Sequence, residues 1–326
     1  MTPIEKKWIV KEPGNPAKVR QLAQELGIDQ VLANLLVQRG ISSFEQAREF
    51  FRPDLSMLHD PFLMVDMDKA VERVHKAVVG NEKILIYGDY DVDGTTAVAL
   101  MYTFLYPMTK NLEYYIPDRY DEGYGVSYKG IDWAHDKGCT LIITLDCGIK
   151  AIEKAKYAKG LGIDMIICDH HLPYPELPQC VAVLDPKRED STYPFDDLSG
   201  CGVGFKLAQA YAQQYDVPRE NVLSLLDLLV VSIASDLVSV TGENRVLAYY
   251  GLKQLNANPR KGLQSVIKLS GLDKHVITID EIVFKIGPRI NAAGRMESGR
   301  MAVDLLTSRS DEDARKIGDE INVHNN

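Results

Sequence analysis

Cysteine is scarce in this sequence and shows no metal-binding spacing. The chain of 326 residues has five cysteines, and no two of them form a C-x-x-C pair. An odd number of cysteines without that spacing excludes a disulfide scaffold and a structural zinc site. Free cysteines are typical of a reducing compartment, so we expect a cytoplasmic protein.

An excess of positive charge is also missing. The chain has 37 Lys and Arg against 46 Asp and Glu, a net charge of -9. This balance excludes a protein that binds nucleic acid by bulk charge, although it leaves room for a local basic groove. Any cluster of the excess carboxylates would need cations to offset its repulsion.

Long hydrophobic segments are absent from the N-terminus and broken elsewhere. The first residues, MTPIEKKWIVKEPGNP, contain no apolar core of a secretory signal. The most apolar run begins at Val222 and carries Asp227 and Asp236, which predicts one long buried helix from Asn221 and no membrane span.

The remaining pattern predicts an α/β fold. Apolar residues at helical spacing fill residues 16 to about 50, and we assign 1–75 to an N-terminal helical extension. From residue 76 to about 215, short β-branched runs alternate with helical stretches, and later residues are largely helical. This alternation predicts a doubly wound, mostly parallel sheet with helices on both faces, followed by a helical segment, within one catalytic domain over 76–326.

Acidic residues and histidines follow three of the predicted strands. In a parallel sheet these strand ends share the carboxyl edge, where doubly wound folds bind their ligands. The candidates are Asp89, Asp91 and Asp93 after the first strand, Asp146 after the third, and His170 and His171 after the fourth. Asp236, at the end of the apolar run, is a further candidate.

Carboxylates gathered in this way repel one another unless cations hold them. Oxygen ligands suit Mg²⁺, and the added imidazole favours Mn²⁺. The number of ligands is sufficient for two ions, the usual arrangement for hydrolysis of phosphate esters.

Two other motifs compete for the segment that begins at Asp89. An EF-hand loop would need Glu at its twelfth position, which is Leu100, and a preceding helix rather than a strand. The nucleophile loop of haloacid-dehalogenase-type phosphatases also fits residues 91–95, but leaves Asp89, His170 and His171 without a role. Gly94, Thr95 and Thr96 are interpreted as a tight turn and helix cap whose amides can receive phosphate.

Several motifs, in one order, resemble those of the DHH phosphoesterase superfamily. They are DYDVDGT at 89–95, DCG at 146–148, DHH at 169–171 and SD at 235–236. The segments LLVQRGI, LHDPFLM, IPDRYDEGYG and GPRINAAGRM resemble more narrowly the bacterial RecJ-type single-strand-specific 5′-to-3′ DNA exonucleases. The resemblance covers about residues 30–310.

This resemblance implies a Mn²⁺- or Mg²⁺-dependent nuclease that releases 5′-mononucleotides in recombination and repair. By motif, it assigns metal binding to Asp89, Asp91, Asp93, Asp146, His170 and Asp236. Asp91 and His171 are the implied catalytic residues, with His171 facing the scissile phosphate. Arg119, Arg289, Asn291 and Arg295 are the implied strand-binding residues, the last three within a locally basic stretch.

The resemblance also implies partners and alternatives. Single-stranded DNA is the expected substrate, with a single-strand-binding protein and a helicase as expected partners. RecJ-type proteins continue into a companion domain and an OB-fold, which we expect to be absent here. The alternatives are a small-substrate phosphoesterase, acting on oligonucleotides, cyclic dinucleotides or pyrophosphate, and an inactive replication scaffold.

Overall fold

The structure, a computed structural model, describes the chain except residues 1–6, 8, 237, 274, 297–298 and 326. Contacts divide the chain into two compact units, Met1–Met57 and Leu58–Asn326. Each unit has a hydrophobic core of its own.

The first unit is a small helical unit. Its helices are α1 (Pro16–Leu26), α2 (Gln30–Val37) and α3 (Phe44–Phe51), followed by the short turn η1 (Leu55–Met57). Leu22, Ala33 and Ala47 form the centre of its core. Side chains cap each helix, as Ser43 does for α3 by accepting from the Gln46 amide.

The second unit begins before residue 75, where the sequence places the boundary. The turn η2 (Pro61–Leu63) and helix α4 (Met67–Val79) both belong to it. Helix α4 packs against β5 and α8, and its Arg73 forms ion pairs with Glu82 and Asp164. The contacts of α4 therefore lie within the α/β unit.

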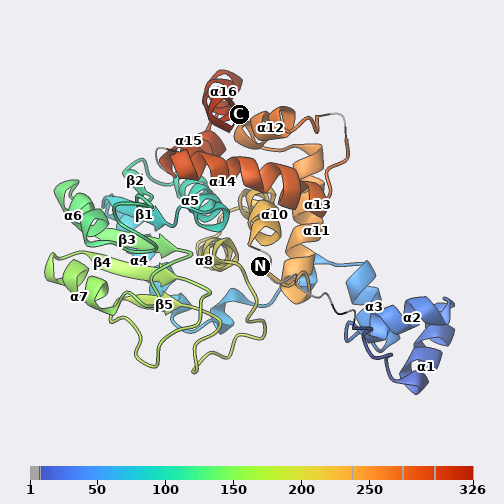
Figure 1. The fold of residues 1–326 in the computed structure, drawn as a ribbon. Helices are drawn as coiled ribbons and strands as arrows, with labels where there is room; N and C mark the ends of the chain where they lie inside the picture. The colour runs from blue at the N-terminus through green and yellow to red at the C-terminus, as the bar shows by residue number, and fades with distance from the viewer. Residues whose placement is uncertain (1–6, 8, 237, 274, 297–298, 326) are drawn as a thin grey trace. The chain divides into compact units, whose positions relative to one another are not determined.

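A parallel sheet is the framework of this unit (Figure 1). In the part of the chain that the structure describes, the order of the five strands is β2-β1-β3-β4-β5 and every pairing is parallel. The strands are β1 (Ile84–Gly88), β2 (Leu112–Tyr115), β3 (Leu141–Leu145), β4 (Asp164–Cys168) and β5 (Ala182–Leu184). The predicted doubly wound sheet is confirmed.

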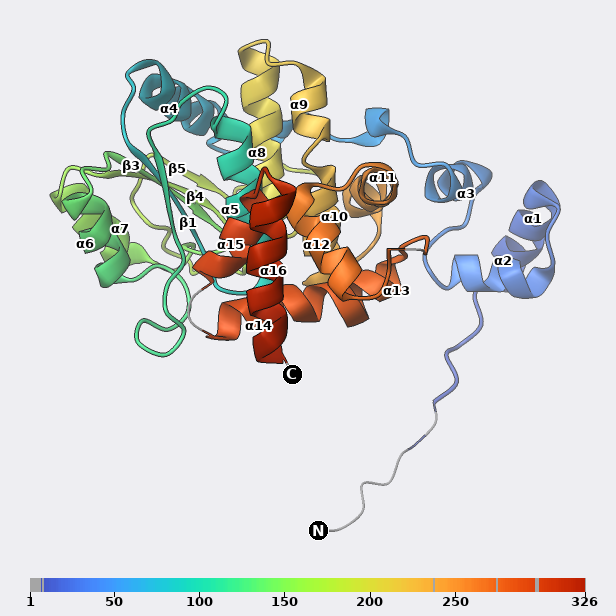
Figure 2. The same cartoon turned by 90° about the horizontal axis from the view of Figure 1, so that it is seen from above.

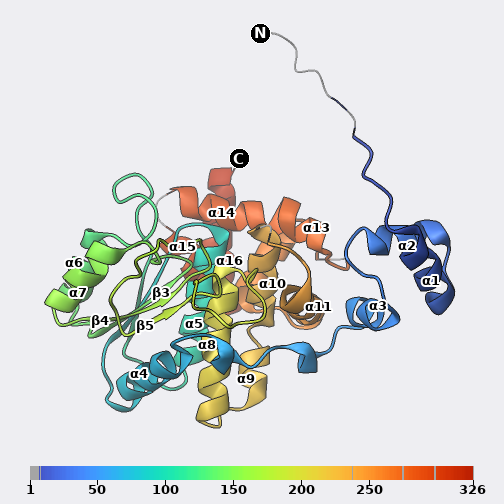
Figure 3. The same cartoon turned by 90° about the horizontal axis from the view of Figure 1, so that it is seen from below.

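Helices cover both faces of the sheet because successive strand residues point to opposite sides. Leu85 and Ile142 pack with α6 (Tyr128–Asp136) and α7 (Ile152–Gly160). Ile84, Ile86 and Ile143 pack on the other side, with α4, α5 (Val92–Leu105) and α8 (Gly200–Gln214). Figures 2 and 3 show α6 and α7 on one side of the strands and α5 and α8 on the other.

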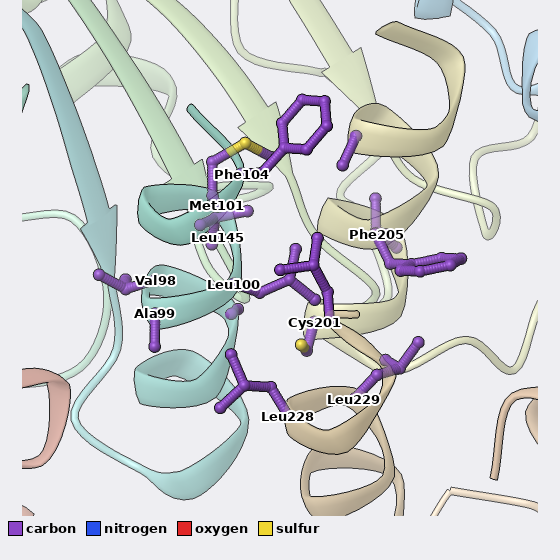
Figure 4. Packing of buried hydrophobic residues seen from close by; sticks show 14 of the residues in the cluster. Val98, Ala99, Leu100, Met101, Phe104, Leu145, Cys201, Phe205, Leu228 and Leu229 are labelled. Atoms are coloured by element: carbon purple, nitrogen blue, oxygen red, sulfur yellow. The ribbon is translucent and has the colours of Figure 1, made fainter. Parts of the chain in front are cut away.

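The chain after the sheet is helical, as predicted. Its elements are α8 and then α9 (Arg219–Leu223), α10 (Leu226–Ser235), α11 (Gly242–Ala257), α12 (Lys261–Leu269), α13 (Ile279–Glu281), the π-helical turn η3 (Ile282–Ile286), α14 (Gly287–Met296), α15 (Arg300–Thr307) and α16 (Asp311–Asn325). Leu100 of α5, Cys201 and Phe205 of α8 and Leu228 of α10 meet in the core (Figure 4).

The prediction of one long apolar helix from Asn221 is wrong, because the run is split into α9 and α10. The carbonyl of Ser224 accepts from the Arg260 guanidinium, and the amides of Leu228 and Leu229 both donate to Leu225. The helical ladder is thus interrupted at Ser224. No helix in the described residues is long and apolar enough to span a membrane.

Candidate metal centre

The predicted acidic cluster forms at the carboxyl edge of the sheet. Asp89 follows β1, Asp146 follows β3, and His170 lies two residues beyond the end of β4. Asp236 reaches the same place from another direction, as the C-cap residue of α10. The first three, far apart in sequence, are brought together because parallel strands end on one side of the sheet, and α10 adds Asp236.

The turn after β1 is shaped by Asp91 and Gly94. Asp91 is the N-cap of α5, and its Oδ1 accepts from the Gly94 amide at 2.9 Å. A Cβ on Gly94 would lie 2.5 Å from the carbonyl oxygen of Asp89, so only glycine allows this close approach. The turn places Asp89, Asp91 and Asp93 on one short segment.

The interpretation of Thr95 and Thr96 as capping residues is wrong. Their hydroxyls donate to the carbonyls of Asp91 and Val92, one turn back, at 2.7 and 2.6 Å. Asp91 provides the cap in their place, because it occupies the N-cap position of α5 whereas Thr95 and Thr96 lie inside the helix.

Asp146 has an unusual backbone conformation. Its φ is 58°, in the left-handed region that costs a residue with a side chain about 1 kcal/mol or more. The side chain is buried, and a Cβ on Gly200 would lie only 2.4 Å from the Asp146 Cβ. The start of α8 therefore packs directly on this aspartate.

His170 lies at the centre of the cluster. Its Nε2 is 3.2 Å from Oδ1 of Asp146, 3.7 Å from Oδ2 of Asp236 and 3.9 Å from Oδ2 of Asp93. Two groups of ligand atoms are close enough to share an ion, Asp93–His170–Asp236 and Asp146–His170–His171. The imidazole is common to both groups.

Several atoms of the cluster are buried without a hydrogen-bond partner among the described residues. They are Asp89 Oδ2, Asp146 Oδ1 and both ring nitrogens of His170. Buried polar atoms left without partners are costly, and oxygen and imidazole nitrogen are the ligands that Mn²⁺ and Mg²⁺ accept. The residues present therefore fit divalent cations.

Electrostatic repulsion supports the same conclusion. Burial and the charges of Asp93 and Asp91 raise the pKa of Asp146 well above its ordinary range. Burial, followed by the charge of Asp93, raises the pKa of Asp236 to about 7, and burial raises that of Asp89 to about 7. Cations would reverse these shifts by favouring the ionised carboxylates.

Both carboxylate oxygens of Asp93 already accept hydrogen bonds from neighbouring helices. Oδ2 accepts from the Gly200 amide at 2.7 Å, and Oδ1 accepts from the Cys201 amide and the Ser232 hydroxyl at 2.9 and 2.7 Å. The amides belong to the first turn of α8, where a negative charge is favoured. Asp93 thus joins the centre to α8 and α10.

Asp169 is a further candidate site residue, which sequence reasoning left without an individual role. It is buried and accepts from the amides of Ile149, His170 and His171, and its Oδ1 lies 2.7 Å from His171 Nδ1. Although burial alone would raise it, the hydrogen bond from His171 lowers the pKa of Asp169, and that bond raises the pKa of His171. Its position in the DHH motif was the available signal.

His171 is the exposed member of the group. Its side chain is 41% exposed, and its Nε2 lies 3.2 Å from the Tyr124 hydroxyl. Asp169 therefore fixes one ring nitrogen, and the other lies beside the Tyr124 hydroxyl.

Asp185 is a second residue that sequence reasoning missed. It follows β5 at the same edge, is buried, and its Oδ2 has no hydrogen-bond partner among the described residues. Burial raises its pKa to about 7. Its place directly after the run VAVL was the available signal.

The predicted strand-binding residues whose side chains the structure describes are not among the groups that could share an ion. Arg119, exposed after β2, lies with its guanidinium 5.1 Å from the ring centre of Tyr90. Arg289 donates to the Lys285 carbonyl at 3.0 Å, and no described hydrogen bond or ion pair joins it to the aspartates. Asn291 is partly buried on the same helix, α14, and the side chain of Arg295 lies outside the described residues.

Helix α14 connects two sides of the centre. A Cβ on Gly287, its first residue, would lie 2.6 Å from the Ser235 hydroxyl oxygen, next to Asp236. Beyond its other end, a Cβ on Gly299 would lie 3.4 Å from the Cα of Tyr90, next to Asp89. Arg289 and Asn291 are therefore carried by a helix that runs along the centre.

Residues 83–233 match a family described as the DHH family, N-terminal domain. The chain is 41% identical over 98% of its length to the single-stranded-DNA-specific exonuclease RecJ of Bacillus subtilis (strain 168), and 32% identical over 90% to that of Escherichia coli (strain K12). It covers 40% and 52% of those proteins, so it spans about half of their length or less.

The fold also matches a solved structure. RecJ from Thermus thermophilus, in complex with Mn²⁺, superposes with a TM-score of 0.81 at 25% identity, over 96% of this chain and 44% of that one. The parallel sheet with helices on both faces agrees with this comparison. Residues 83–233 are therefore similar to the N-terminal domain of the DHH family, and the chain is similar over most of its length to RecJ proteins.

Proposed function

We propose that this chain is the catalytic part of a metal-dependent exonuclease that degrades single-stranded DNA from 5′ to 3′ and releases 5′-mononucleotides, in recombination and repair. The observation that carries the proposal is the cluster of buried aspartates around His170, with unpartnered ligand atoms, beside the half-exposed His171. The names of the similar RecJ proteins, and the Mn²⁺ in one of them, support the substrate and the metal.

In this proposal, one set of residues holds the metal ions and another acts on the scissile phosphate. Asp89, Asp91, Asp93, Asp146, His170 and Asp236 hold two ions, Mn²⁺ or Mg²⁺. When bound, such ions activate the attacking water and offset charge on the phosphoryl oxygens. His171, oriented by Asp169, contacts the scissile phosphate and donates a proton to the leaving 3′ oxygen.

Strand binding is assigned to Arg119, Arg289, Asn291 and Arg295. A guanidinium suits a phosphate because its planar donors match two phosphate oxygens. Tyr120 and Tyr128, which are 82% and 48% exposed, offer faces for base stacking beside Arg119 and at the start of α6. A single-strand-binding protein and a helicase as partners, and a cytoplasmic location, stay predictions from the sequence.

The reaction is tested with single strands labelled at either end, in the presence of Mn²⁺. We expect mononucleotides from the 5′ end and little attack on duplex DNA or on 3′ ends. Equal attack from both ends would contradict the stated polarity. Faster turnover of a dinucleotide than of a long strand would favour the small-substrate phosphoesterase.

Metal binding is tested separately from activity. Asp146→Asn should abolish Mn²⁺ binding, measured by electron paramagnetic resonance, because it removes a buried ligand oxygen. Asp136→Asn is the matched control, since Asp136 is exposed at the end of α6. Equal Mn²⁺ binding by the wild type and Asp146→Asn would contradict the assigned centre, and no binding by the wild type would favour the inactive scaffold.

A further inference from the structure

Basic residues lie at both margins of the carboxyl edge of the sheet. Because the strand order is β2-β1-β3-β4-β5, the residues after β1, β3 and β4 are the central ones, and they carry the proposed ligands. Arg119 lies beyond β2 on one side. Lys187 lies beyond β5 on the other, and the proposed function gives it no role.

A tight turn fixes the backbone of Lys187. The Lys187 amide donates to Oδ1 of the buried Asp185 at 2.7 Å. Asp185 itself is held beside β4, because the Asp169 amide donates to the carbonyl of Leu184. Lys187 is therefore attached firmly to the edge that bears Asp169.

The neighbouring basic residue, Arg188, uses its guanidinium for contacts within the protein. Its guanidinium donates to Asp66 at 2.7 Å, to Asp190 at 2.8 and 2.7 Å and to the Val183 carbonyl. Lys187 differs, because its ammonium makes no hydrogen bond or ion pair with any residue that the structure describes. The two adjacent cations thus have different roles.

Lys187 nevertheless lies at the same edge of the sheet as the metal centre, two residues after Asp185, which follows β5. Burial lowers the pKa of His170, and the positive charge of Lys187 adds to this effect. The same charge opposes the rise of the Asp236 and Asp185 pKa values that burial causes. Lys187 is only partly buried.

We propose that the Lys187 ammonium binds a phosphate of the single strand on the β5 side of the metal centre. The strand then lies across the carboxyl edge of the sheet, from Lys187 to Arg119. Four spacings between neighbouring strands separate β2 from β5, about 19 Å, which is the rise of roughly five stacked nucleotides. This inference rests on the proposed function, because it assumes that a single strand is the substrate.

The first test is the salt dependence of binding. Fluorescence anisotropy of a 3′-labelled single strand is measured in EDTA, where metal-dependent cleavage does not proceed. Lys187→Gln should bind about tenfold more weakly and lower the slope of log K against log salt by about 0.7, the value for one phosphate contact in a single strand. Lys187→Arg should retain most of the affinity.

The matched control is Lys159→Gln, which removes the same charge from an exposed lysine near the C-terminal end of α7. Equal affinities and slopes for Lys187→Gln and Lys159→Gln would overturn the inference while leaving the proposed function intact. A wild type that binds no single strand would overturn both.

A second test does not depend on the stability of the variant. A neutral methylphosphonate is placed at one linkage of the strand at a time. At the linkage that Lys187 contacts, the substitution should weaken binding by the wild type and leave binding by Lys187→Gln unchanged. If no methylphosphonate position weakens binding by the wild type more than binding by Lys187→Gln, the inference is overturned. With Mn²⁺, Lys187→Gln should raise KM more than it lowers kcat, because the contact is already made in the bound substrate.

Discussion

Asp169 and His171 have separable effects on stability and on catalysis. Asp169 is buried and holds three backbone amides and one ring nitrogen, whereas the His171 side chain is 41% exposed. Asp169→Asn should lower the free energy of unfolding by about 2–3 kcal/mol, because one amide oxygen cannot satisfy these donors. His171→Gln should leave stability nearly unchanged and lower kcat about a hundredfold, measured with the labelled strand.

Mn²⁺ binding is the control for this comparison. His171→Gln should still bind Mn²⁺ through the remaining ligands. If the stability of Asp169→Asn equals that of the wild type in urea unfolding, Asp169 does not hold the turn as described.

Stability should also depend on pH in a metal-dependent way. Asp89, Asp185 and Asp236 have pKa values of about 7 in the folded chain, against 3.8 for an ordinary Asp. Between these values the folded state binds more protons than the unfolded state. The free energy of unfolding in EDTA should therefore fall as pH rises from about 4 to 7, by at most about 1.4 kcal/mol per unit for each carboxyl, and level off above.

The raised pKa of His171 acts in the same direction, since its contribution is present at low pH and lost as pH rises through the folded value. Saturating Mn²⁺ should remove or reverse the slope, because the ions bind the deprotonated carboxylates. Urea unfolding over a pH series, with and without Mn²⁺, measures both. A stability that rises from pH 4 to 7 in EDTA would contradict the raised pKa values.

The first turn of α8 is the element on which the centre is built. Its amides bind Asp93, and its Gly200 touches Asp146. Gly200→Ala places a methyl group 2.4 Å from the Asp146 Cβ, so it should lower the free energy of unfolding by about 1–3 kcal/mol and weaken Mn²⁺ binding. Thermal unfolding and Mn²⁺ titration are the measurements.

The substitution Gly160→Ala, at the last residue of α7, is the matched control for Gly200→Ala. No heavy atom lies within 4 Å of a Cβ built there, so Gly160→Ala should raise stability by about 0.4–1 kcal/mol and leave Mn²⁺ binding unaltered. If Gly200→Ala and Gly160→Ala have the same stability and the same Mn²⁺ binding, the close packing of α8 on Asp146 is not important for the centre.

The sequence predicted which segments form strands or helices better than it predicted where the helices end. The alternation of apolar runs identified the strands and helices of the sheet, since the periods 2 and 3.6 are local properties of a sequence. The break between α9 and α10 was not predicted. It depends on Arg260, which lies 36 residues beyond Ser224 and binds its carbonyl.

For the whole molecule, the contact division predicts which truncation is tolerated. All proposed metal ligands lie in Leu58–Asn326. Removing residues 1–57 should leave the centre able to bind Mn²⁺, with a thermal midpoint close to that of the intact chain. Removing residues 1–75 should unfold the protein, because it deletes the buried Met67, Val71 and Val74 and the two ion pairs of Arg73.

Circular dichroism melting and Mn²⁺ binding compare the two fragments. Equal stability of residues 76–326 and residues 58–326 would support the boundary placed at residue 75 from the sequence. Loss of Mn²⁺ binding by residues 58–326 would show that the first unit is needed for the centre.

The sequence by itself determined the parallel α/β fold, the edge at which the site lies and the residues that gather there, because strand periodicity and strand ends are local features. Tertiary structure decided what each residue does there. Asp93 is bound by amides 107 and 108 residues away, and Asp185 lies beside Asp169 only because β5 pairs with β4. The acidic net charge of the chain excluded a protein that binds nucleic acid by bulk charge. The fold nevertheless places Arg119 and Lys187 at the two margins of the centre. Such contacts depend on how distant segments pack, which no local pattern specifies.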